Sequence, residues 1–207
     1  MSDEIKQEYM QFNSGTLFHR KLDTGAGKNI ILLHGWSFTS RNWKDVGAFQ
    51  HLGDLGFNVY APDYPGFGNS DPQDRYTIRR GDISRGTEFV RDYMGHIGVK
   101  NAYILGASMG GGMAVMAALD IPDMVDGIIA VAPAWVEDQK DRMAGITKPV
   151  LFIWGSNDNV VMPSLGQQYS SIIKGSRLEI VQDAPHPVYI DQPMRFFSIV
   201  SDFLRSH

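Results

Sequence analysis

Some short segments of the chain are apolar at every position, such as residues 30–33, which read Ile-Ile-Leu-Leu, and residues 150–153, which read Val-Leu-Phe-Ile. A strand with one face in water alternates apolar with polar side chains, whereas a strand covered on both faces does not need to alternate. The two runs therefore predict interior strands of a parallel sheet that has helices packed on both faces.

The rest of the chain alternates between β-type and helix-type segments. The first two predicted strands, 9–12 and 16–22, flank Asn13-Ser14-Gly15, a favourable hairpin turn. Further strands are predicted at 29–33, 57–61, 102–105, 127–132, 149–154 and 177–181, and helices at 40–55, 82–97, 109–121, 164–173 and 193–204. This order predicts one α/β domain over residues 1–207, with an antiparallel N-terminal hairpin followed by a mostly parallel central sheet.

The composition of the chain indicates which partners and which cellular compartment to expect. The 207 residues carry a formal net charge of -4 and include no cysteine. The charge offers no attraction for nucleic acid or for an anionic membrane, and neither a disulfide nor a Cys-ligated metal is possible. The N-terminus lacks the basic-then-apolar order of a signal peptide, and no apolar run approaches the roughly twenty residues that cross a bilayer. We therefore expect a soluble, cytoplasmic protein without nucleic-acid or membrane partners, and the sequence favours no oligomeric state.

Residues 106–110 read Gly-Ala-Ser-Met-Gly and stand between a predicted strand and a predicted helix. A serine on such a sharp turn points its hydroxyl off the end of the sheet, and flanking glycines avoid collisions with neighbouring backbone. A turn that only lets strand and helix pack closely is the structural alternative. Two other glycine motifs do not fit: a dinucleotide fingerprint would need glycine at Ser108, and a phosphate loop ending at Gly27-Lys28 would need glycine at Leu22.

In a parallel sheet, functional side chains gather in the loops at the carboxyl ends of the strands. Three such loops carry Ser108, Asp158 and His186. A histidine can take the proton of a serine hydroxyl near neutral pH, and a carboxylate behind the ring fixes its tautomer. Singly, a loop aspartate is usually a turn former and a histidine usually a local hydrogen bonder. Together, and in this chain order, the three residues predict a Ser-His-Asp triad.

Order, spacing and motifs resemble the α/β-hydrolase superfamily over essentially the whole chain. Within it, the sequence resembles the small lidless group around alpha/beta-hydrolase domain-containing protein fourteen. The segments that carry this resemblance are Leu32-Leu33-His34-Gly35, residues 63–70 (Asp-Tyr-Pro-Gly-Phe-Gly-Asn-Ser) and residues 186–193 (His-Pro-Val-Tyr-Ile-Asp-Gln-Pro). Residues 106–110 depart from the group and have the common esterase form, so the resemblance does not extend to a substrate.

The resemblance implies a hydrolase of short acyl esters or amides, with Ser108 as nucleophile, His186 as general base and then acid, and Asp158 as the carboxylate that orients the histidine. It also implies an oxyanion hole formed by the backbone N–H groups of Trp36 and Met109. His34 is expected to brace its loop by hydrogen bonds, and the loop 63–70 is expected to hold a tight turn below the site.

Large lids in this superfamily are inserted between the sixth and seventh strands, where this chain has only residues 133–148. We therefore expect an open, shallow site with minimal or no lid. Candidates to line it as substrate-binding residues are Phe38, Trp135, Met143, Met162 and Val188, although such side chains are more often plain core. Glu137 and Asp138, just past the preceding strand, are rivals of Asp158 for the role of the acid.

The leading hypothesis is a carboxylesterase-like serine hydrolase that cleaves short-acyl esters through an acyl-enzyme, without cofactor or metal. A small-molecule acyl compound would be the substrate. One alternative is a cofactor-free perhydrolase, in which peroxide replaces water in deacylation. Another is a slow-turnover ligand-sensing or interaction protein on the same fold. A catalytically dead scaffold is disfavoured because the three triad residues and the oxyanion loop are all present.

Overall fold

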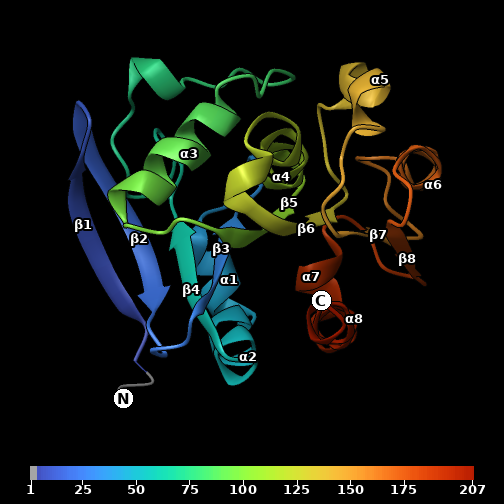
Figure 1. The fold of residues 1–207 in the computed structure, drawn as a ribbon, viewed down its shortest axis with the longest axis horizontal. Coiled ribbons are helices and arrows are strands. Elements are labelled where there is room, and N and C mark those ends of the chain that lie inside the picture. The colour runs from blue at the N-terminus through green and yellow to red at the C-terminus, as the bar shows by residue number, and fades with distance from the viewer. Residues whose placement is uncertain (1–3) are drawn as a thin grey trace.

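One eight-stranded sheet runs through residues 4–207, the part of the chain that the computed structural model describes (Figure 1). In spatial order its strands are β1 (Lys6–Phe12), β2 (Gly15–Leu22), β4 (Phe57–Pro62), β3 (Lys28–Leu33), β5 (Ala102–Ala107), β6 (Val125–Val131), β7 (Val150–Gly155) and β8 (Arg177–Val181). β1 pairs with β2 and β2 with β4 in antiparallel fashion, and every later pair is parallel. The predicted fold class, a mostly parallel sheet with an antiparallel start, is confirmed.

The two wholly apolar runs are interior strands, as predicted. Residues 30–33 lie in β3 between β4 and β5, and residues 150–153 lie in β7 between β6 and β8. All eight side chains are buried. Full burial of a large aliphatic side chain contributes roughly 1.5–3 kcal/mol. These strands therefore anchor the sheet, and the loops at their carboxyl ends start from a rigid base.

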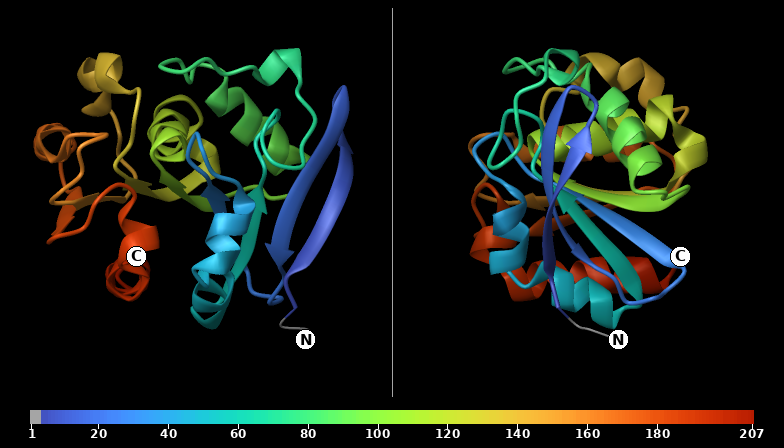
Figure 2. Two further views of the ribbon diagram at one scale, coloured as in Figure 1. Left: turned by 180° about the vertical axis from the view of Figure 1, so that it is seen from behind. Right: turned by 90° about the vertical axis from the view of Figure 1, so that its left-hand side faces the viewer.

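Helices cover both faces of the sheet (Figure 1 and Figure 2). One face carries α3 (Gly86–His96), α4 (Met109–Asp120) and α6 (Pro163–Ile172), and the other carries α1 (Ser40–Asp45), α2 (Ala48–Asp54), α7 (Val188–Asp191) and α8 (Pro193–Arg205). Short turns of helix in the connections are η1 (Asp74–Tyr76), η2 (Pro122–Met124), η3 (Glu137–Gln139) and α5 (Lys140–Met143). The predicted layering on both faces is confirmed.

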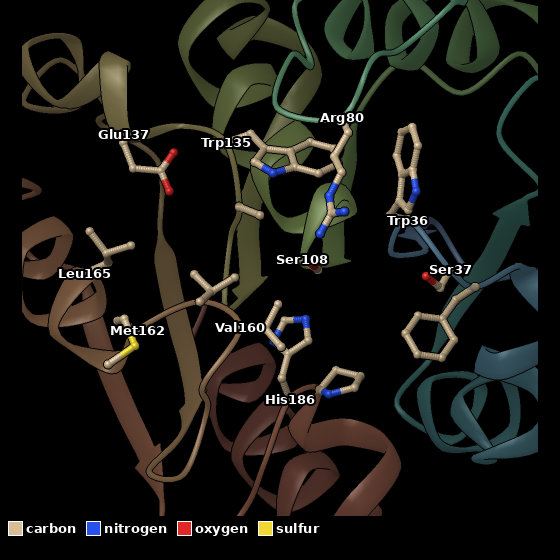
Figure 3. A pocket seen from close by; sticks show the side chains of 14 residues that line it. Trp36, Ser37, Arg80, Ser108, Trp135, Glu137, Val160, Met162, Leu165 and His186 are labelled. Carbon is tan, nitrogen blue, oxygen red and sulfur yellow. The ribbon is translucent and has the colours of Figure 1, made fainter.

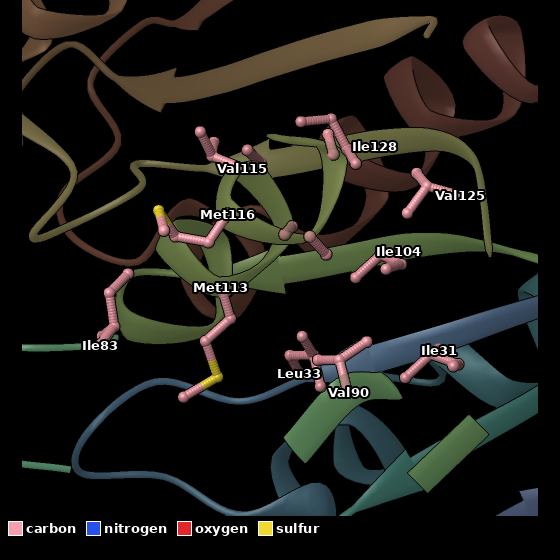
Figure 4. Close-up of a cluster of buried hydrophobic side chains, with 14 of the residues drawn as sticks. Ile31, Leu33, Ile83, Val90, Ile104, Met113, Val115, Met116, Val125 and Ile128 are labelled. Atoms are coloured by element: carbon pink, nitrogen blue, oxygen red, sulfur yellow. The ribbon is translucent and has the colours of Figure 1, made fainter. Parts of the chain in front are cut away.

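Helix α4 is the most deeply buried helix near the sheet centre, because residues 109–118 are all buried. Its side chains Met113, Val115 and Met116 join the core cluster that includes Ile104 of β5 and Ile128 of β6 (Figure 4). A helix that is apolar on all sides must be enclosed by the fold. The start of α4, where Ser108 stands, is therefore held by the core behind it.

Three helical segments differ from the predictions. The predicted helix 40–55 is two helices, because Gly47 adopts φ 80° between α1 and α2, a left-handed conformation that interrupts an α-helix and suits glycine. The predicted helix 82–97 begins later, at Gly86. In the residues before it, Asp82 Oδ1 accepts the N–H of Ser84 in a local turn. Helix α7 has no counterpart among the predicted elements.

The connection between β6 and β7 contains only η3 and α5, which together span seven residues, Glu137 to Met143. The predicted minimal lid is therefore confirmed, because this connection inserts no separate helical layer above the sheet. Within residues 4–207, the helices are all too short or too polar to span a bilayer.

Candidate active site

Ser108 stands between β5 and α4 with φ 54° and ψ -115°. A residue with a side chain is strained in this conformation, which persists only where the surrounding structure holds it. Two backbone hydrogen bonds do so: Ser108 N–H donates to Val131 O over 2.8 Å, and Ala134 N–H donates to Ser108 O over 3.0 Å. The end of β6 and the residues after it thus fix the serine at the carboxyl edge of the sheet.

The glycines around Ser108 are required by close backbone contacts. A Cβ on Gly106 would collide with the carbonyl oxygen of Gly110, and a Cβ on Gly110 would collide with that of Leu33. Both obstacles are backbone atoms, which cannot rotate away as a flexible side chain could. The two glycines therefore allow the close backbone packing that holds Ser108 on this turn.

Asp158 and His186 come from different loops and are in direct contact. His186 Nδ1 donates to Asp158 Oδ2 over 2.7 Å, while Asp158 Oδ1 accepts the N–H groups of Val160 and Val161, each at 2.9 Å. Asp158 is only 3% exposed, so these three donors replace water around its carboxylate. With its proton on Nδ1, the neutral imidazole has its lone pair on Nε2.

Ser108 and His186 line one open cavity of about 530 Å³ at the carboxyl edge of the sheet (Figure 3). In residues 4–207, Ser108 Oγ and the His186 ring share the cavity without a direct hydrogen bond between them. Such bonds are often long before substrate binds and tighten in the reacting complex. The arrangement thus brings a serine hydroxyl, an imidazole and a buried carboxylate to one place.

The two candidate oxyanion donors flank Ser108. Trp36 lines the cavity in the loop after β3, and Met109 is the first residue of α4. Within the described residues, neither backbone N–H has a hydrogen-bond acceptor, whereas Phe38 N–H in the same loop donates to Gly35 O. The first N–H groups of a helix are unpaired within the helix, and its dipole favours negative charge there. The Met109 side chain is buried in the core, and Met109 is not among the residues that line the cavity.

Of the predicted substrate-binding side chains, Phe38, Trp135 and Met162 line the cavity. The rings of Trp36 and Trp135 meet edge to face, with centroids 5.5 Å apart, and make part of an aromatic wall. Met162 is 57% exposed and adds an apolar side chain to the rim.

The structure corrects the prediction for Met143 and Val188, neither of which lines the cavity. Met143, at the end of α5, is fully buried in the core on the α4 face of the sheet. Val188, at the start of α7, is buried in the core on the opposite face. Val188 is close to His186 in sequence and Met143 is not, and in both cases a short helix turns the side chain inward.

Sequence reasoning missed several residues that line the cavity, namely Ser37, Arg80, Ala134, Val160, Val161, Leu165 and Pro187. Val160, Val161 and Leu165 follow Asp158 closely, so their position after β7 was an available signal. Arg80 had no such signal, because it lies in the loop between η1 and α3, far from any strand end.

The predicted bracing role of His34 is confirmed. Its Nδ1 donates to Gly35 O over 2.8 Å, and its Nε2 accepts the N–H of Tyr64 over 2.9 Å. Burial lowers the pKa of His34, which keeps the ring neutral and able to accept that bond. In the loop 63–70, buried Asp63 accepts the N–H groups of Ser40 and Asn69, so this loop is a structural support.

Within residues 4–207, neither rival acid contacts His186. Glu137 and Asp138 are exposed in η3, and only Glu137 lines the cavity. Among the described residues, Asp158 is the carboxylate in contact with His186.

Residues 28–147 match the family described as alpha/beta hydrolase fold, which is more than half of the chain. The chain belongs to this α/β-hydrolase family, and it is a hydrolase of the superfamily that resembles the ABHD14 proteins. The putative protein-lysine deacylase ABHD14B of Rattus norvegicus is 25% identical over 207 residues, covering 98% of this chain and 97% of that protein.

Two further proteins extend this similarity. The pimeloyl-[acyl-carrier protein] methyl ester esterase of Shewanella sp. (strain MR-7) is 29% identical over 166 residues, covering 77% of this chain and 58% of that protein. A solved structure from Thermoplasma acidophilum, described as a predicted CIB-like hydrolase, is 49% identical, with a TM-score of 0.96 and coverage of 99% of both chains. The names among these relatives include an esterase and a deacylase, so they agree on hydrolysis but not on one bond.

Proposed function

We propose that the protein is a carboxylesterase-like serine hydrolase that cleaves short-acyl esters through an acyl-enzyme on Ser108. The main support is the 2.7 Å contact between His186 Nδ1 and Asp158 Oδ2 beside a cavity that also contains Ser108. The strained conformation of Ser108 at the start of α4 is a second support, because strain of this kind concentrates at functional sites.

In the first half of the proposed reaction, His186 Nε2 takes the proton of Ser108 Oγ as Oγ attacks the carbonyl carbon. Asp158 stays ionised and stabilises the imidazolium. That imidazolium then gives its proton to the leaving alcohol oxygen as the ester C–O bond breaks. In the second half, a water molecule gives a proton to Nε2 and attacks the acyl carbon. The proton returns to Ser108 Oγ as the acid is released.

The negative charge on the carbonyl oxygen would be met by the N–H groups of Trp36 and Met109, which have no acceptor among the described residues. Donors held in advance at this position need no rearrangement during the reaction, and a single such donor is typically worth about 10²–10³ in kcat. Their backbone origin leaves the Trp36 side chain to form the cavity wall.

Reaction with a fluorophosphonate probe tests the nucleophile, because the probe labels a serine that a base has activated. We expect labelling at Ser108 alone, with loss of both labelling and ester hydrolysis in Ser108→Ala. Ser37→Ala is the matched control, since Ser37 lines the same cavity and this variant should still be labelled at Ser108. Labelling at Ser37 would overturn the assignment. Labelling of Ser108 without repeated turnover on a broad ester panel would favour the ligand-sensing alternative.

A series of ester chain lengths tests the substrate class. The cavity is open and has no separate lid, so a long acyl chain gains little of the roughly 0.8 kcal/mol that each fully buried methylene contributes. We expect kcat/KM to peak between acetyl and butyryl esters and to fall for octanoyl esters. Peptides with Nε-acetyl-lysine belong in the same panel because of the name of the rat relative. Faster cleavage of these amides than of the short esters would contradict the ester assignment.

A further inference from the structure

The cavity contains one positively charged side chain, Arg80, for which the proposed mechanism has no role. Arg80 belongs to the loop between η1 and α3, and its guanidinium group points toward Ser108 (Figure 3). Most of the other lining residues are apolar, among them Trp36, Trp135 and Leu165. Arg80 is exposed to solvent, so salt screens its attraction for an anion, and the apolar walls reduce that screening only on the side that faces the cavity.

Arg80 has no protein partner within residues 4–207. Arg79, Arg195 and Arg205 also form no ion pair among the described residues, whereas the other arginines pair with carboxylates, namely Arg20, Arg41, Arg75, Arg85, Arg91, Arg142 and Arg177. Glu137, the acidic residue on the cavity wall, is drawn apart from the guanidinium in Figure 3, and it forms no ion pair with Arg80 among the described residues. The five N–H donors of Arg80 are therefore available to a molecule in the cavity.

We propose that Arg80 is a specificity-determining residue that binds a carboxylate group of the substrate, so that the preferred esters are anionic. This inference rests on the proposed serine-hydrolase function. A guanidinium group donates two parallel hydrogen bonds to a carboxylate, which gives both orientation and affinity. The carboxylate belongs either to the acyl part, as in a half-ester of a dicarboxylic acid, or to the leaving group, as in an ester of a hydroxy acid.

Two matched substrate pairs separate these sources. The first pair is the methylumbelliferyl half-ester of glutaric acid and its analogue with a terminal carboxamide. The second pair is 4-acetoxybenzoate and 4-acetoxybenzamide. Within each pair, only the charge differs appreciably, so the ratio of the two kcat/KM values reports recognition of the carboxylate. Hydrolysis that remains in Ser108→Ala is subtracted as background.

We expect the wild-type protein to prefer the anionic member of one pair by about 10- to 100-fold, the range of a charge-assisted hydrogen bond. Arg80→Gln should bring that ratio close to one. Arg79→Gln should keep it, because it removes the same charge from the neighbouring position, which does not line the cavity. The wild-type ratio should also decrease as salt is raised, since the screening length shortens from about 30 Å at 0.01 M to 3 Å at 1 M.

Three results would overturn the role of Arg80 while leaving the proposed function intact. One is hydrolysis through Ser108 with no anionic preference in either pair. Another is an equal loss on charged and neutral esters in Arg80→Gln, which would mean that Arg80 acts on the reacting oxygen or shapes the cavity. The third is an equal loss of the ratio in Arg79→Gln. Circular dichroism and thermal unfolding of each variant show whether loss of the anionic preference comes from misfolding. If Arg80→Gln misfolds, Arg80→Lys serves as the second variant, and we expect it to keep part of the preference.

Two fluorophosphonate probes, one with a carboxylate and one with a carboxamide, test the same preference without turnover. The quantity measured is the rate at which each probe labels Ser108. Faster labelling of Ser108 by the anionic probe, lost in Arg80→Gln, supports the inference even if none of the four esters is a good substrate. Failure of both probes to label Ser108 would overturn the proposed function, and the role of Arg80 with it.

Discussion

Two loops at the carboxyl edge of the sheet each present a histidine, and the two rings are used in opposite ways. In the loop after β3, both nitrogens of His34 are engaged, one by Gly35 O and one by the N–H of Tyr64. In the loop after β8, His186 uses Nδ1 to contact Asp158, and its other nitrogen has no partner within residues 4–207. The residues also differ in exposure, since His34 is buried and His186 is half-buried.

The comparison shows that hydrogen-bond saturation, in addition to burial, separates a structural histidine from a candidate base. A ring with both nitrogens engaged holds two loops together and has no lone pair left to accept a proton. A ring held on one side by a carboxylate is oriented and still has a free lone pair. Substitutions in the two loops should therefore affect different properties, activity in one and stability in the other.

The largest expected effect is on the His186 side. His186→Ala should lower kcat/KM by about 10⁴–10⁶, because the proposed serine nucleophile loses its base. The free energy of unfolding should fall less than in His34→Leu, because water from the open cavity can replace the donor that Asp158 Oδ2 loses. Steady-state kinetics and urea unfolding of the same preparation measure both quantities. A variant that stays active, or one that loses stability in proportion to activity, would break the contrast with His34.

Asp158→Asn sharpens the contrast by removing the charge that distinguishes the environment of His186 from that of His34. We expect kcat to fall by up to about 10⁴, because an asparagine side chain can favour the wrong tautomer of the ring. The matched controls are Glu137→Gln and Asp138→Asn, which lose the same charge from η3 and should alter kcat little. If either control loses most of its kcat while Asp158→Asn stays active, the carboxylate that orients His186 is Glu137 or Asp138 and not Asp158.

His34→Leu should have its main effect on stability. It removes both hydrogen bonds and leaves the buried N–H of Tyr64 without an acceptor, which should cost about 1–3 kcal/mol of unfolding free energy. Chemical denaturation measures this loss, and the residual kcat/KM of the folded fraction should stay much closer to wild type than in His186→Ala. A folded, stable His34→Leu protein that has lost its activity would show that His34 belongs to the catalytic machinery.

The smallest expected effect is a pH dependence of stability on the His34 side. Burial lowers the pKa of His34 below its ordinary value of 6.5, and burial also lowers that of His19 in β2. Below pH 6.5 the unfolded chain therefore binds more protons than the folded one, and stability decreases as the pH falls toward the lowered values. Thermal unfolding between pH 7.5 and about 5 should show a shallower decline in His34→Leu than in wild type. Parallel curves would mean that His34 is not the titrating group.

Much of the fold followed from local patterns. The uninterrupted apolar runs at 30–33 and 150–153 predicted interior strands, because a side chain buried on either face must be apolar. The pattern at residues 106–110 predicted a sharp turn, because only glycine tolerates the backbone contacts that Gly106 and Gly110 make there. The chain order of Ser108, Asp158 and His186 suggested one sheet edge, since the carboxyl ends of parallel strands meet there.

The direction of side chains outside the strands followed from no local pattern. Val188 was as close to a strand end in sequence as Met162, yet short helices turn both Val188 and Met143 into the core. Arg80 reaches the cavity from a loop that no periodicity connects with it. The sequence by itself thus determined the strands, their parallel arrangement and the turn that carries Ser108, because each depends on neighbouring residues. Only the tertiary structure decided which loop side chains meet in the cavity and which histidine keeps a free nitrogen, because both depend on segments that are distant in sequence and packed against each other.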